Sequence, residues 1–240
     1  MASLDISIVS PTRNEVKNVP ILVREIAKVL KKEKLKGELI IVDDSSPDGT
    51  GAEVKRLSKK YKFIKLISKP FGMDLGDKYK VGFAAARGKV IVSIDSDLAE
   101  PPELIPKLLE KLDEGYDVVI GSKYAPGGGT PGWSPLRRLQ SGVANLMARV
   151  LLGIKVRDMT CAFRAYKREA LQKIDIPTVK SSGYSFMQET LFRATRADLK
   201  IAEIPFTLQD RKFGESKLGR KEIFRFLETV GRLFVERLTS

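Results

Sequence analysis

The sequence contains no histidine and only one cysteine, Cys161. Without histidine, a Ser-His-Asp or Cys-His catalytic arrangement is excluded, and so is a histidine-ligated zinc site. A single cysteine excludes a disulfide within the chain and is typical of a protein from a reducing compartment. Any chemistry must therefore rest on carboxylates, hydroxyls, arginine and lysine side chains, and a hard metal ion.

Long apolar runs are also missing. No stretch of about 18 apolar residues occurs, so the sequence predicts no transmembrane helix. The first residues, MASLDISIVSPTRNE, pass directly into a strand pattern and show no signal peptide. We therefore expect a cytoplasmic protein, one that associates peripherally with the cytoplasmic face of a membrane.

Acidic residues are outnumbered by basic ones, 30 against 43, and the formal net charge is +13. Such an excess attracts nucleic acid, acidic lipid surfaces or phosphorylated ligands. No zinc-finger spacing and no RNP-type aromatic motif accompanies the basic residues. A phosphate-rich ligand or an anionic membrane explains the charge at least as well as nucleic acid, and we expect no nucleic-acid partner.

Short apolar strands alternate with longer amphipathic stretches through the first half of the chain. Strands are expected at 6–9, 39–42, 63–67, 90–94, 117–120, 159–165 and 200–206, and helices at 15–34, 76–87, 103–114, 167–173, 184–197 and 220–238. This alternation predicts an α/β fold with a Rossmann-like, mostly parallel sheet covered by helices on both faces. We expect one domain over 1–218, with a nucleotide-binding half (1–125) and an acceptor half (126–218), followed by an amphipathic helix at 219–240.

Polar residues follow these strands at the carboxyl ends, where sheets of this type bind ligands. Asp95 and Asp97 are two apart on an extended chain, so both carboxylates face one side and can converge on one cation. Such ligands suit Mg²⁺ or Mn²⁺, which also take phosphate oxygens. A solvated pair in a turn is the alternative. Asp43 and Asp44 offer hydrogen bonds to a base or ribose, or one of them caps the next helix.

The combined motifs resemble family 2 GT-A glycosyltransferases. The segments that carry the resemblance are Ser-Pro-Thr-Arg-Asn-Glu from Ser10, Val-Asp-Asp-Ser-Ser-Pro-Asp-Gly-Thr from Val42 and Asp-Ser-Asp-Leu-Ala-Glu-Pro-Pro from Asp95. Later segments resemble the dolichol- or polyprenyl-phosphate mannose synthase branch, namely Gly-Ser-Lys-Tyr from Gly121, Gly-Tyr-Ser-Phe-Met-Gln-Glu from Gly183 and Asp-Arg-Lys-Phe-Gly-Glu-Ser-Lys-Leu from Asp210.

The resemblance implies roles for residues of this chain. Asp95 and Asp97 would hold the metal and the donor diphosphate, and Asp97 would act in catalysis with Arg211 and Lys217. These two cations would close over the donor phosphates and stabilise the charge of the leaving group, unless they lie in an ordinary solvated loop. The two aspartates and the two cations would bind the nucleotide-sugar. The other residues of that site would be Pro11, Arg13, Glu15, Val42 and Asp44.

The acceptor phosphate would be bound by Lys123, Arg137 and Ser141. Arg137 and Ser141 lie at i and i+4 on a helix that begins at Ser134-Pro135, so they share one face. An exposed basic helix is the alternative interpretation.

The implied reaction is inverting transfer of a sugar from a nucleotide-sugar, of the GDP-mannose or UDP-glucose type, to dolichyl or polyprenyl phosphate. A phosphate monoester has a second pKa of about 6, so the acceptor is already ionised and needs no strong base. Two alternatives stay open. One is transfer to a hydroxyl of a cell-envelope glycan, with Glu189 as the first candidate base. The other is a non-catalytic protein with a degenerate transferase fold that binds anionic lipid or nucleic acid.

Departures from the family pattern cluster around donor recognition. Arg13 replaces the usual tyrosine, Ala99 a glutamine and Lys123 an arginine. The usual Lys-Gly-Leu-Gly-x-Ala run appears as Met-Asp-Leu-Gly-Asp-Lys at 73–78. The C-terminal helix carries an apolar stripe with interspersed arginines, and this pattern suits an anionic membrane or packing on the core equally well.

Overall fold

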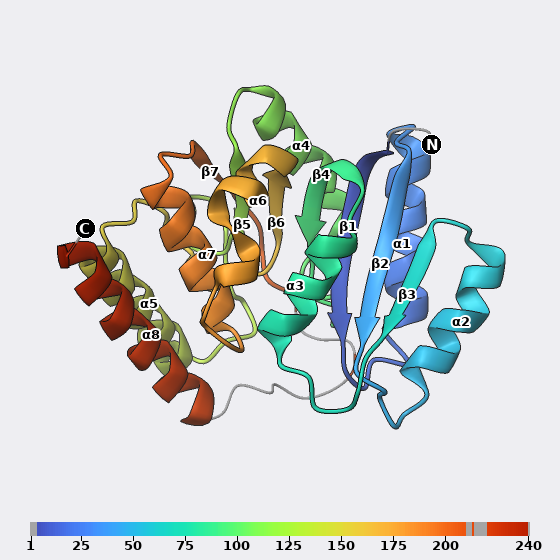
Figure 1. The fold of residues 1–240 in the computed structure, drawn as a ribbon, viewed down its shortest axis with the longest axis horizontal. Coiled ribbons are helices and arrows are strands. Elements are labelled where there is room, and N and C mark those ends of the chain that lie inside the picture. Colours follow the sequence, from blue (N-terminus) through green and yellow to red (C-terminus); the bar gives the residue numbers. More distant parts are fainter. Residues whose placement is uncertain (1–3, 210–212, 214–219, 240) are drawn as a thin grey trace.

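The computed structural model describes residues 4–209, 213 and 220–239. Within these ranges one seven-stranded sheet has the order β3-β2-β1-β4-β6-β5-β7 (Figure 1). The strands are β1 (Leu4–Thr12), β2 (Gly37–Asp43), β3 (Ile64–Ser68), β4 (Gly88–Ser93), β5 (Val118–Ser122), β6 (Arg164–Lys167) and β7 (Ile201–Pro205). The predicted α/β fold with a mostly parallel sheet is confirmed.

The exception to the parallel arrangement is β6, which pairs antiparallel with both β4 and β5. Because both neighbours oppose β6, β4 and β5 run in the same direction. The carboxyl ends of β1, β2, β4 and β5 therefore lie along one edge, the lower edge of the sheet in Figure 1. The motifs that the sequence placed after these strands share that edge.

The strand predicted at 159–165 is displaced toward the C-terminus. Residues 158–163 form a loop, because the Asp158 carboxylate accepts hydrogen bonds from the N–H groups of Thr160 and Cys161 and holds the chain in a turn. The helix predicted at 15–34 is shorter at both ends, since residues 15–18 form a turn in which the Glu15 carbonyl accepts the N–H groups of Asn18 and Val19.

Helices cover both faces of the sheet (Figure 1). On one face α3 packs against β1 and β2, and α6 packs against β4 and β6; α1 and α4 lie on the other. The helices around the sheet are α1 (Val19–Lys32), α2 (Thr50–Lys60), α3 (Leu75–Ala85), α4 (Ile105–Asp113), α6 (Arg168–Ile174) and α7 (Ser185–Arg196). Two short 3₁₀ helices are η1 (Pro102–Leu104) and η2 (Ile176–Thr178).

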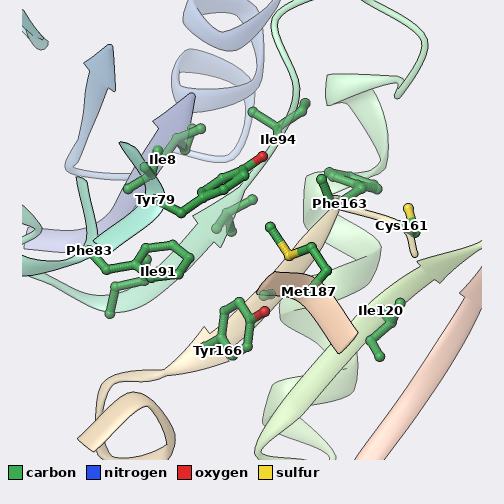
Figure 2. Packing of buried hydrophobic residues seen from close by; sticks show 14 of the residues in the cluster. Ile8, Tyr79, Phe83, Ile91, Ile94, Ile120, Cys161, Phe163, Tyr166 and Met187 are labelled. Carbon is green, nitrogen blue, oxygen red and sulfur yellow. The ribbon is translucent and has the colours of Figure 1, made fainter. Parts of the chain in front are cut away.

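An aromatic cluster joins α3 to α7 over the centre of the sheet. The rings of Tyr79 and Phe186 stack at 5.9 Å between centroids, and the Phe83 ring lies edge-on to Tyr166 at 5.8 Å. Figure 2 shows Tyr79, Phe83, Tyr166 and Met187 packed between the strands and these helices. Such packing of large buried rings fixes where α3 stands, and with it the side chains that α3 directs to the edge of the sheet.

The last two long helices, α5 (Pro135–Leu152) and α8 (Arg220–Thr239), lie side by side at one end of the molecule (Figure 1). Helix α5 begins as predicted, with the Ser134 hydroxyl accepting the Arg137 N–H. Helix α8 packs on α7 and α5 through the buried Val230 and Leu233. Its outer side exposes further large apolar residues, Ile223, Phe224, Leu227, Val235 and Leu238. None of the described helices is long and apolar enough to cross a bilayer.

Candidate active site

A cavity of about 330 Å³ opens at the carboxyl edge of the sheet. Distant parts of the chain build its walls, which are Pro11, Thr12, Arg13 and Glu15 after β1, Gly72 to Leu75 and Lys78 at the start of α3, Asp95 to Asp97 after β4, Gly183 and Tyr184 before α7, and Glu222 and Arg225 of α8. The cavity thus brings together the ends of two central strands and the starts of three helices.

Both aspartates of the D-x-D motif line this cavity and are held by their neighbours. The Tyr79 hydroxyl donates to Asp95 Oδ1 at 2.8 Å, and the Ala99 N–H donates to Asp97 Oδ1 at 3.0 Å. Burial raises the pKa of Tyr79 well above its ordinary value, and the Asp95 carboxylate raises it further, so the phenol stays protonated and remains a donor. The motif is therefore pre-oriented by the fold.

Glu100 holds the backbone of the D-x-D motif in place, a role that was not predicted from the sequence. This buried carboxyl accepts the N–H groups of Asp95 and Phe163, so it ties the end of β4 to the loop before β6. Burial raises the pKa of Glu100 well above its ordinary value, and the nearby Asp95 carboxylate adds to the rise. In the sequence Glu100 belongs to the Asp-Ser-Asp-Leu-Ala-Glu-Pro-Pro segment that carries the family resemblance, but no role was assigned to it there.

The donor set of the motif fits a hard divalent cation that is shared with a phosphate ligand. Asp95 and Asp97 supply carboxylate oxygens, the ligands that Mg²⁺ and Mn²⁺ prefer, and such ions commonly complete their coordination with water and substrate phosphate. In the described ranges no group of three or more His, Cys, Asp or Glu residues is gathered to hold a metal by itself.

The other residues that were predicted to bind the donor lie in two different places. Pro11, Arg13 and Glu15 line the cavity, whereas Val42 and Asp44 are fully buried behind it. Protein groups surround the Asp44 carboxylate, with the Lys78 ammonium 2.8 Å from Oδ1, the Gly72 N–H 3.1 Å from Oδ2 and the Arg13 guanidinium 3.7 Å from Oδ2.

Neither Asp43 nor Asp44 caps the helix that follows. Asp43 accepts from Thr12 and Ser46, and the turn before α2 is instead closed by Asp48, whose Oδ1 accepts the Thr50 N–H at 2.9 Å. The capping alternative for the two adjacent aspartates is therefore wrong.

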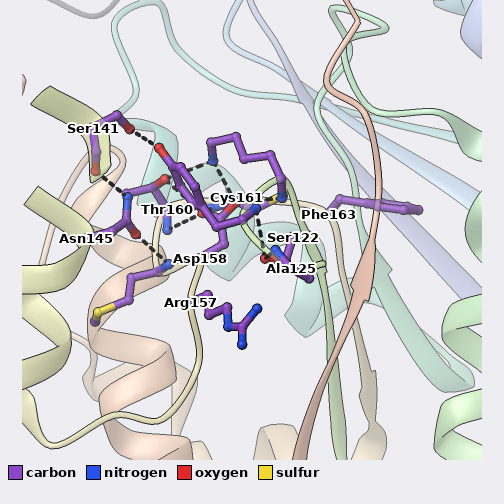
Figure 3. Close-up of polar contacts among 12 residues, drawn as sticks. Ser122, Ala125, Ser141, Asn145, Arg157, Asp158, Thr160, Cys161 and Phe163 are labelled. Atoms are coloured by element: carbon purple, nitrogen blue, oxygen red, sulfur yellow. Dashed lines mark hydrogen bonds and ion pairs between the residues drawn. The ribbon is translucent and has the colours of Figure 1, made fainter. Parts of the chain in front are cut away.

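Lys123 forms a buried ion pair with Asp158 at 2.7 Å (Figure 3). Burial alone would lower the pKa of Lys123, but the Asp158 carboxylate raises it above the ordinary value. Asp158 is 35 residues further along the chain and was not anticipated. Because its charge is balanced, Lys123 adds little net positive charge to the surface beside it.

The three predicted acceptor residues are brought together around two aromatic rings. The Tyr124 hydroxyl donates to Ser141 Oγ at 2.6 Å (Figure 3), the Lys123 ammonium lies 5.0 Å from the Tyr124 ring centroid, and the Arg137 guanidinium lies 4.2 Å from the Trp133 ring centroid. The Lys123 ammonium also lies 6.0 Å from the Trp133 ring. We call these five residues the α5 cluster.

The family of this chain follows from its similarity to known proteins. Residues 7–175 match the sequence profile of the family described as glycosyl transferase family 2. The chain belongs to this family. It is 36% identical over 220 residues to a polyprenol monophosphomannose synthase of Mycolicibacterium smegmatis, an alignment covering 90% of this chain and 82% of that protein. It is also 36% identical over 233 residues to a dolichol-phosphate mannosyltransferase of Pyrococcus furiosus, covering 96% of this chain and 64% of that protein.

Solved structures agree on the fold of this glycosyltransferase. A glucosyl-3-phosphoglycerate synthase from Mycobacterium tuberculosis, in complex with Mn²⁺, UDP and glucosyl-3-phosphoglycerate, has a TM-score of 0.69 at 22% identity and covers 98% of this chain and 80% of that one. A mannosyl-3-phosphoglycerate synthase from Rubrobacter xylanophilus has a TM-score of 0.69 at 19% identity and covers 98% and 74%. At such identities the likeness establishes the GT-A fold alone.

Two predicted catalytic residues of this glycosyltransferase, Arg211 and Lys217, lie outside the described residues. The cations that the described chain does place at the cavity include Arg13, Lys78 and Arg225. Arg225 pairs with Asp74 and Glu222, so α8 is tied to the start of α3 across the cavity. No local sequence pattern indicated that α8 reaches this site.

Glu189, the candidate base for a hydroxyl acceptor, is not placed for that task. It is buried away from the cavity and is bound by Ser181, the Lys180 N–H, Arg193 and Arg232. Burial alone would raise the pKa of Glu189, but the hydrogen bonds from Ser181, Lys180 and Arg232 lower it to about 2. A carboxylate with so low a pKa is a poor base at neutral pH, so this hypothesis is wrong.

The same network predicts acid-sensitive stability. A carboxyl whose pKa falls from 4.5 to about 2 on folding stabilises the protein above pH 4.5, and this contribution, about 3 kcal/mol, is lost as the pH falls toward 2. Glu189→Gln should lower the free energy of unfolding at pH 7 by about that amount and flatten its decline between pH 4.5 and 2, as followed by urea denaturation. Glu169→Gln, an exposed change on α6, is the control. Equal pH profiles for Glu189→Gln and the unmodified protein would contradict the assignment.

Proposed function

We propose that this glycosyltransferase transfers a sugar, with inversion, from a nucleoside diphosphate sugar to dolichyl or polyprenyl phosphate at the cytoplasmic face of a membrane. The observation that carries the proposal is the α5 cluster, where Arg137 and Ser141 of α5 lie beside the rings of Trp133 and Tyr124 and α5 itself has an exposed apolar side. The names of the two 36% identical relatives, a polyprenol monophosphomannose synthase and a dolichol-phosphate mannosyltransferase, support a lipid phosphate acceptor.

The donor diphosphate belongs at the D-x-D motif in this proposal. Asp95 and Asp97 would hold Mg²⁺ or Mn²⁺, which when bound neutralises charge on the departing diphosphate. The pairing of Mn²⁺ with UDP in the mycobacterial glucosyl-3-phosphoglycerate synthase supports this arrangement. Arg211 and Lys217 are proposed to bind the same phosphates, and Pro11, Arg13 and Glu15 to line the donor.

The acceptor needs no protein base. With a second pKa of about 6, a phosphate monoester is largely dianionic at neutral pH. One of its oxygens attacks the anomeric carbon and forms the new C–O bond, while the bond to the donor diphosphate breaks and its electron pair leaves with the nucleoside diphosphate. A single displacement inverts the anomeric centre. Arg137 binds the acceptor phosphate with Ser141, while Lys123, balanced by Asp158, orients Tyr124 and Trp133.

Peripheral membrane binding is the remaining part of the proposal. Five exposed residues of α5, spaced three and four apart, form an apolar stripe, and they are Leu136, Leu139, Val143, Leu146 and Val150. The sequence of α5 contains three arginines and no acidic residue. An apolar stripe with basic residues beside it suits an anionic lipid surface, and it lies on the helix that carries Arg137 and Ser141. We call the exposed apolar residues of α5 and α8 the apolar end face.

The test is sugar transfer by the full chain to polyprenyl phosphate in anionic vesicles, with labelled GDP-mannose or UDP-glucose and Mn²⁺. We expect a lipid-soluble product with one donor. Arg137→Ala should raise KM for the lipid phosphate at least tenfold and leave donor affinity unchanged, because one charge-assisted contact is lost. Arg138→Ala removes the same charge one residue along the helix and serves as the control. Transfer to polyprenol instead of its phosphate, or equal losses in both variants, would contradict the proposal.

A further inference from the structure

Asn145 is a buried amide on α5, one turn after Ser141. Its Nδ2 donates to the Ser141 carbonyl at 2.9 Å, and its Oδ1 accepts the Met159 N–H at 2.9 Å (Figure 3). The residue is only 3% exposed. A buried amide is costly unless it is hydrogen-bonded, and here its two ends bind two different parts of the chain. Asn145 therefore fastens α5 to the loop that precedes β6.

The half of α5 that carries the proposed acceptor residues is held by little else. Residues 135–144 of the described helix are all exposed or half-buried, and Asn145 is the first buried residue. The buried residues that follow, Ala148 and Leu152, lie toward the end that contacts α8. Because tertiary packing provides most of the stability of a helix in a protein, the orientation of this half depends strongly on Asn145.

A directional contact suits this position. The large apolar residues in this part of α5, Leu136, Leu139, Val143 and Leu146, are exposed and belong to the apolar end face. They are therefore not used to pack the helix on the protein. Hydrogen bonds fix rotation about the helix axis, because they weaken steeply when donor and acceptor are misaligned. Asn145 thus sets which way the other side of the helix faces.

The loop that Asn145 contacts is tied to the sheet at both ends. At its start Glu203 of β7 accepts the Asp158 N–H at 3.0 Å. At its end Glu100 accepts the Phe163 N–H at 3.0 Å, and the same carboxyl holds the backbone of the D-x-D motif. The loop is therefore a fixed reference between α5 and the proposed metal site.

We infer that Asn145 is a positioning residue that sets where Arg137 and Ser141 stand relative to the donor. This inference rests on the proposed transfer to a lipid phosphate. The three residues are four apart, so they share one side of α5, and Asn145 connects that side to the loop. An acceptor phosphate bound there has to hold one oxygen within about 3.5 Å of the anomeric carbon, so a small rotation of α5 misplaces the nucleophile.

A purely structural role is the competing explanation, in which Asn145 only satisfies the Met159 N–H. Asn145→Ala removes both hydrogen bonds, and each variant is measured below its melting temperature so that only folded protein is compared. Leu152→Ala, at the buried end of the same helix, is the matched control, because it destabilises the protein through a cavity and leaves the α5 cluster intact. The double variant Arg137→Ala/Asn145→Ala shows whether Asn145 acts through Arg137.

The first experiment is transfer from the labelled nucleotide-sugar to polyprenyl phosphate in anionic vesicles with Mn²⁺. Asn145→Ala should lower kcat/KM for the lipid phosphate about tenfold and leave donor affinity unchanged, because two hydrogen bonds that position the acceptor residues are lost. In the Arg137→Ala background the same change should lower it by less than about threefold, because one of the residues that it positions is already gone. Leu152→Ala should keep the kcat/KM of the unmodified protein.

The second experiment, acrylamide quenching of Trp133, needs no turnover. Trp133 is the only tryptophan, it lies just before α5, and its ring contacts the Arg137 guanidinium. Asn145→Ala should raise the quenching constant, because the start of α5 opens more readily, and Leu152→Ala should leave it unchanged.

Losses that multiply in the double variant, or an equal fall in donor affinity, would overturn the inference and leave Asn145 with a structural role. The same conclusion follows if Leu152→Ala loses as much transfer, or if quenching of Trp133 is unchanged in Asn145→Ala. If the unmodified protein does not transfer to polyprenyl phosphate, the proposed function fails, and the quenching result still decides whether Asn145 positions the start of α5.

Discussion

Asp97→Asn is expected to abolish metal-dependent donor binding and to lower kcat/KM by about 10³-fold, the largest effect of any single change in the described site. Asp97 lines the cavity and is largely buried, and its Oδ1 accepts the Ala99 N–H. Asparagine keeps the volume and an oxygen that accepts this hydrogen bond. It removes the negative charge, which is the property that a divalent cation requires.

The measurement is calorimetry of the donor nucleotide with Mn²⁺ and with EDTA. The unmodified protein should bind in Mn²⁺ and lose affinity in EDTA, and Asp97→Asn should bind equally weakly in both. Asp113→Asn, at the exposed end of α4, is the control for charge loss elsewhere. Retained metal-dependent binding by Asp97→Asn, with an unchanged melting temperature, would remove the metal assignment from the D-x-D motif.

The edge of the sheet that carries the site was predictable, because the polar residues that mark it directly follow the apolar strands in the sequence. Apolar strands followed by Asp44, Asp95 or Lys123 show which side chains lie at that edge, since parallel strands share one carboxyl edge. Strand direction is less local, and the antiparallel β6 was not anticipated. Its short run carries no direction signal, and the Asp158 turn that precedes it depends on a side chain folding back on its own backbone.

The partners of the predicted residues were harder to foresee than the residues themselves. Glu100 reaches Phe163 across 63 positions, and Lys123 reaches Asp158 across 35. Such pairs depend on how the loops cross the end of the sheet, which periodicity does not encode. Arg225 is a stronger case, because a residue of the last helix pairs with Asp74 across 151 positions and closes one side of the cavity.

These contacts link the apolar end face to the donor cavity through one helix. Helix α8 directs Glu222 and Arg225 into the cavity wall, while Phe224 and Leu227 on its other side are exposed. Arg137 and Ser141 of the α5 cluster lie on the adjacent helix, which is joined to α8 where Arg237 donates to the carbonyl of Leu151. A surface that holds α5 and α8 would thus contact the helix that carries the proposed acceptor residues Arg137 and Ser141 and the helix that forms one wall of the cavity.

Two charges placed on the apolar end face are expected to abolish vesicle binding. Leu139 and Leu146 of α5 are 64% and 57% exposed. Burying each leucine in the interface contributes about 1.5 kcal/mol, so Leu139→Glu/Leu146→Glu should weaken partitioning by at least about 100-fold, and repulsion from anionic lipids adds to this. Cosedimentation with anionic vesicles measures the effect, and the fluorescence of Trp133, the only tryptophan, reports insertion beside the α5 cluster.

The matched control is Ala52→Glu/Lys55→Gln on α2, which makes the same change in net charge at the opposite end of the molecule (Figure 1). It should bind vesicles nearly as the unmodified protein does. The α5 variant should keep its donor affinity, because neither leucine lines the cavity, and should lose transfer to polyprenyl phosphate in vesicles. If it binds vesicles normally but no longer self-associates where the unmodified protein does, the apolar end face contacts a second copy of the chain, and the membrane part of the proposed function fails while its chemistry stands.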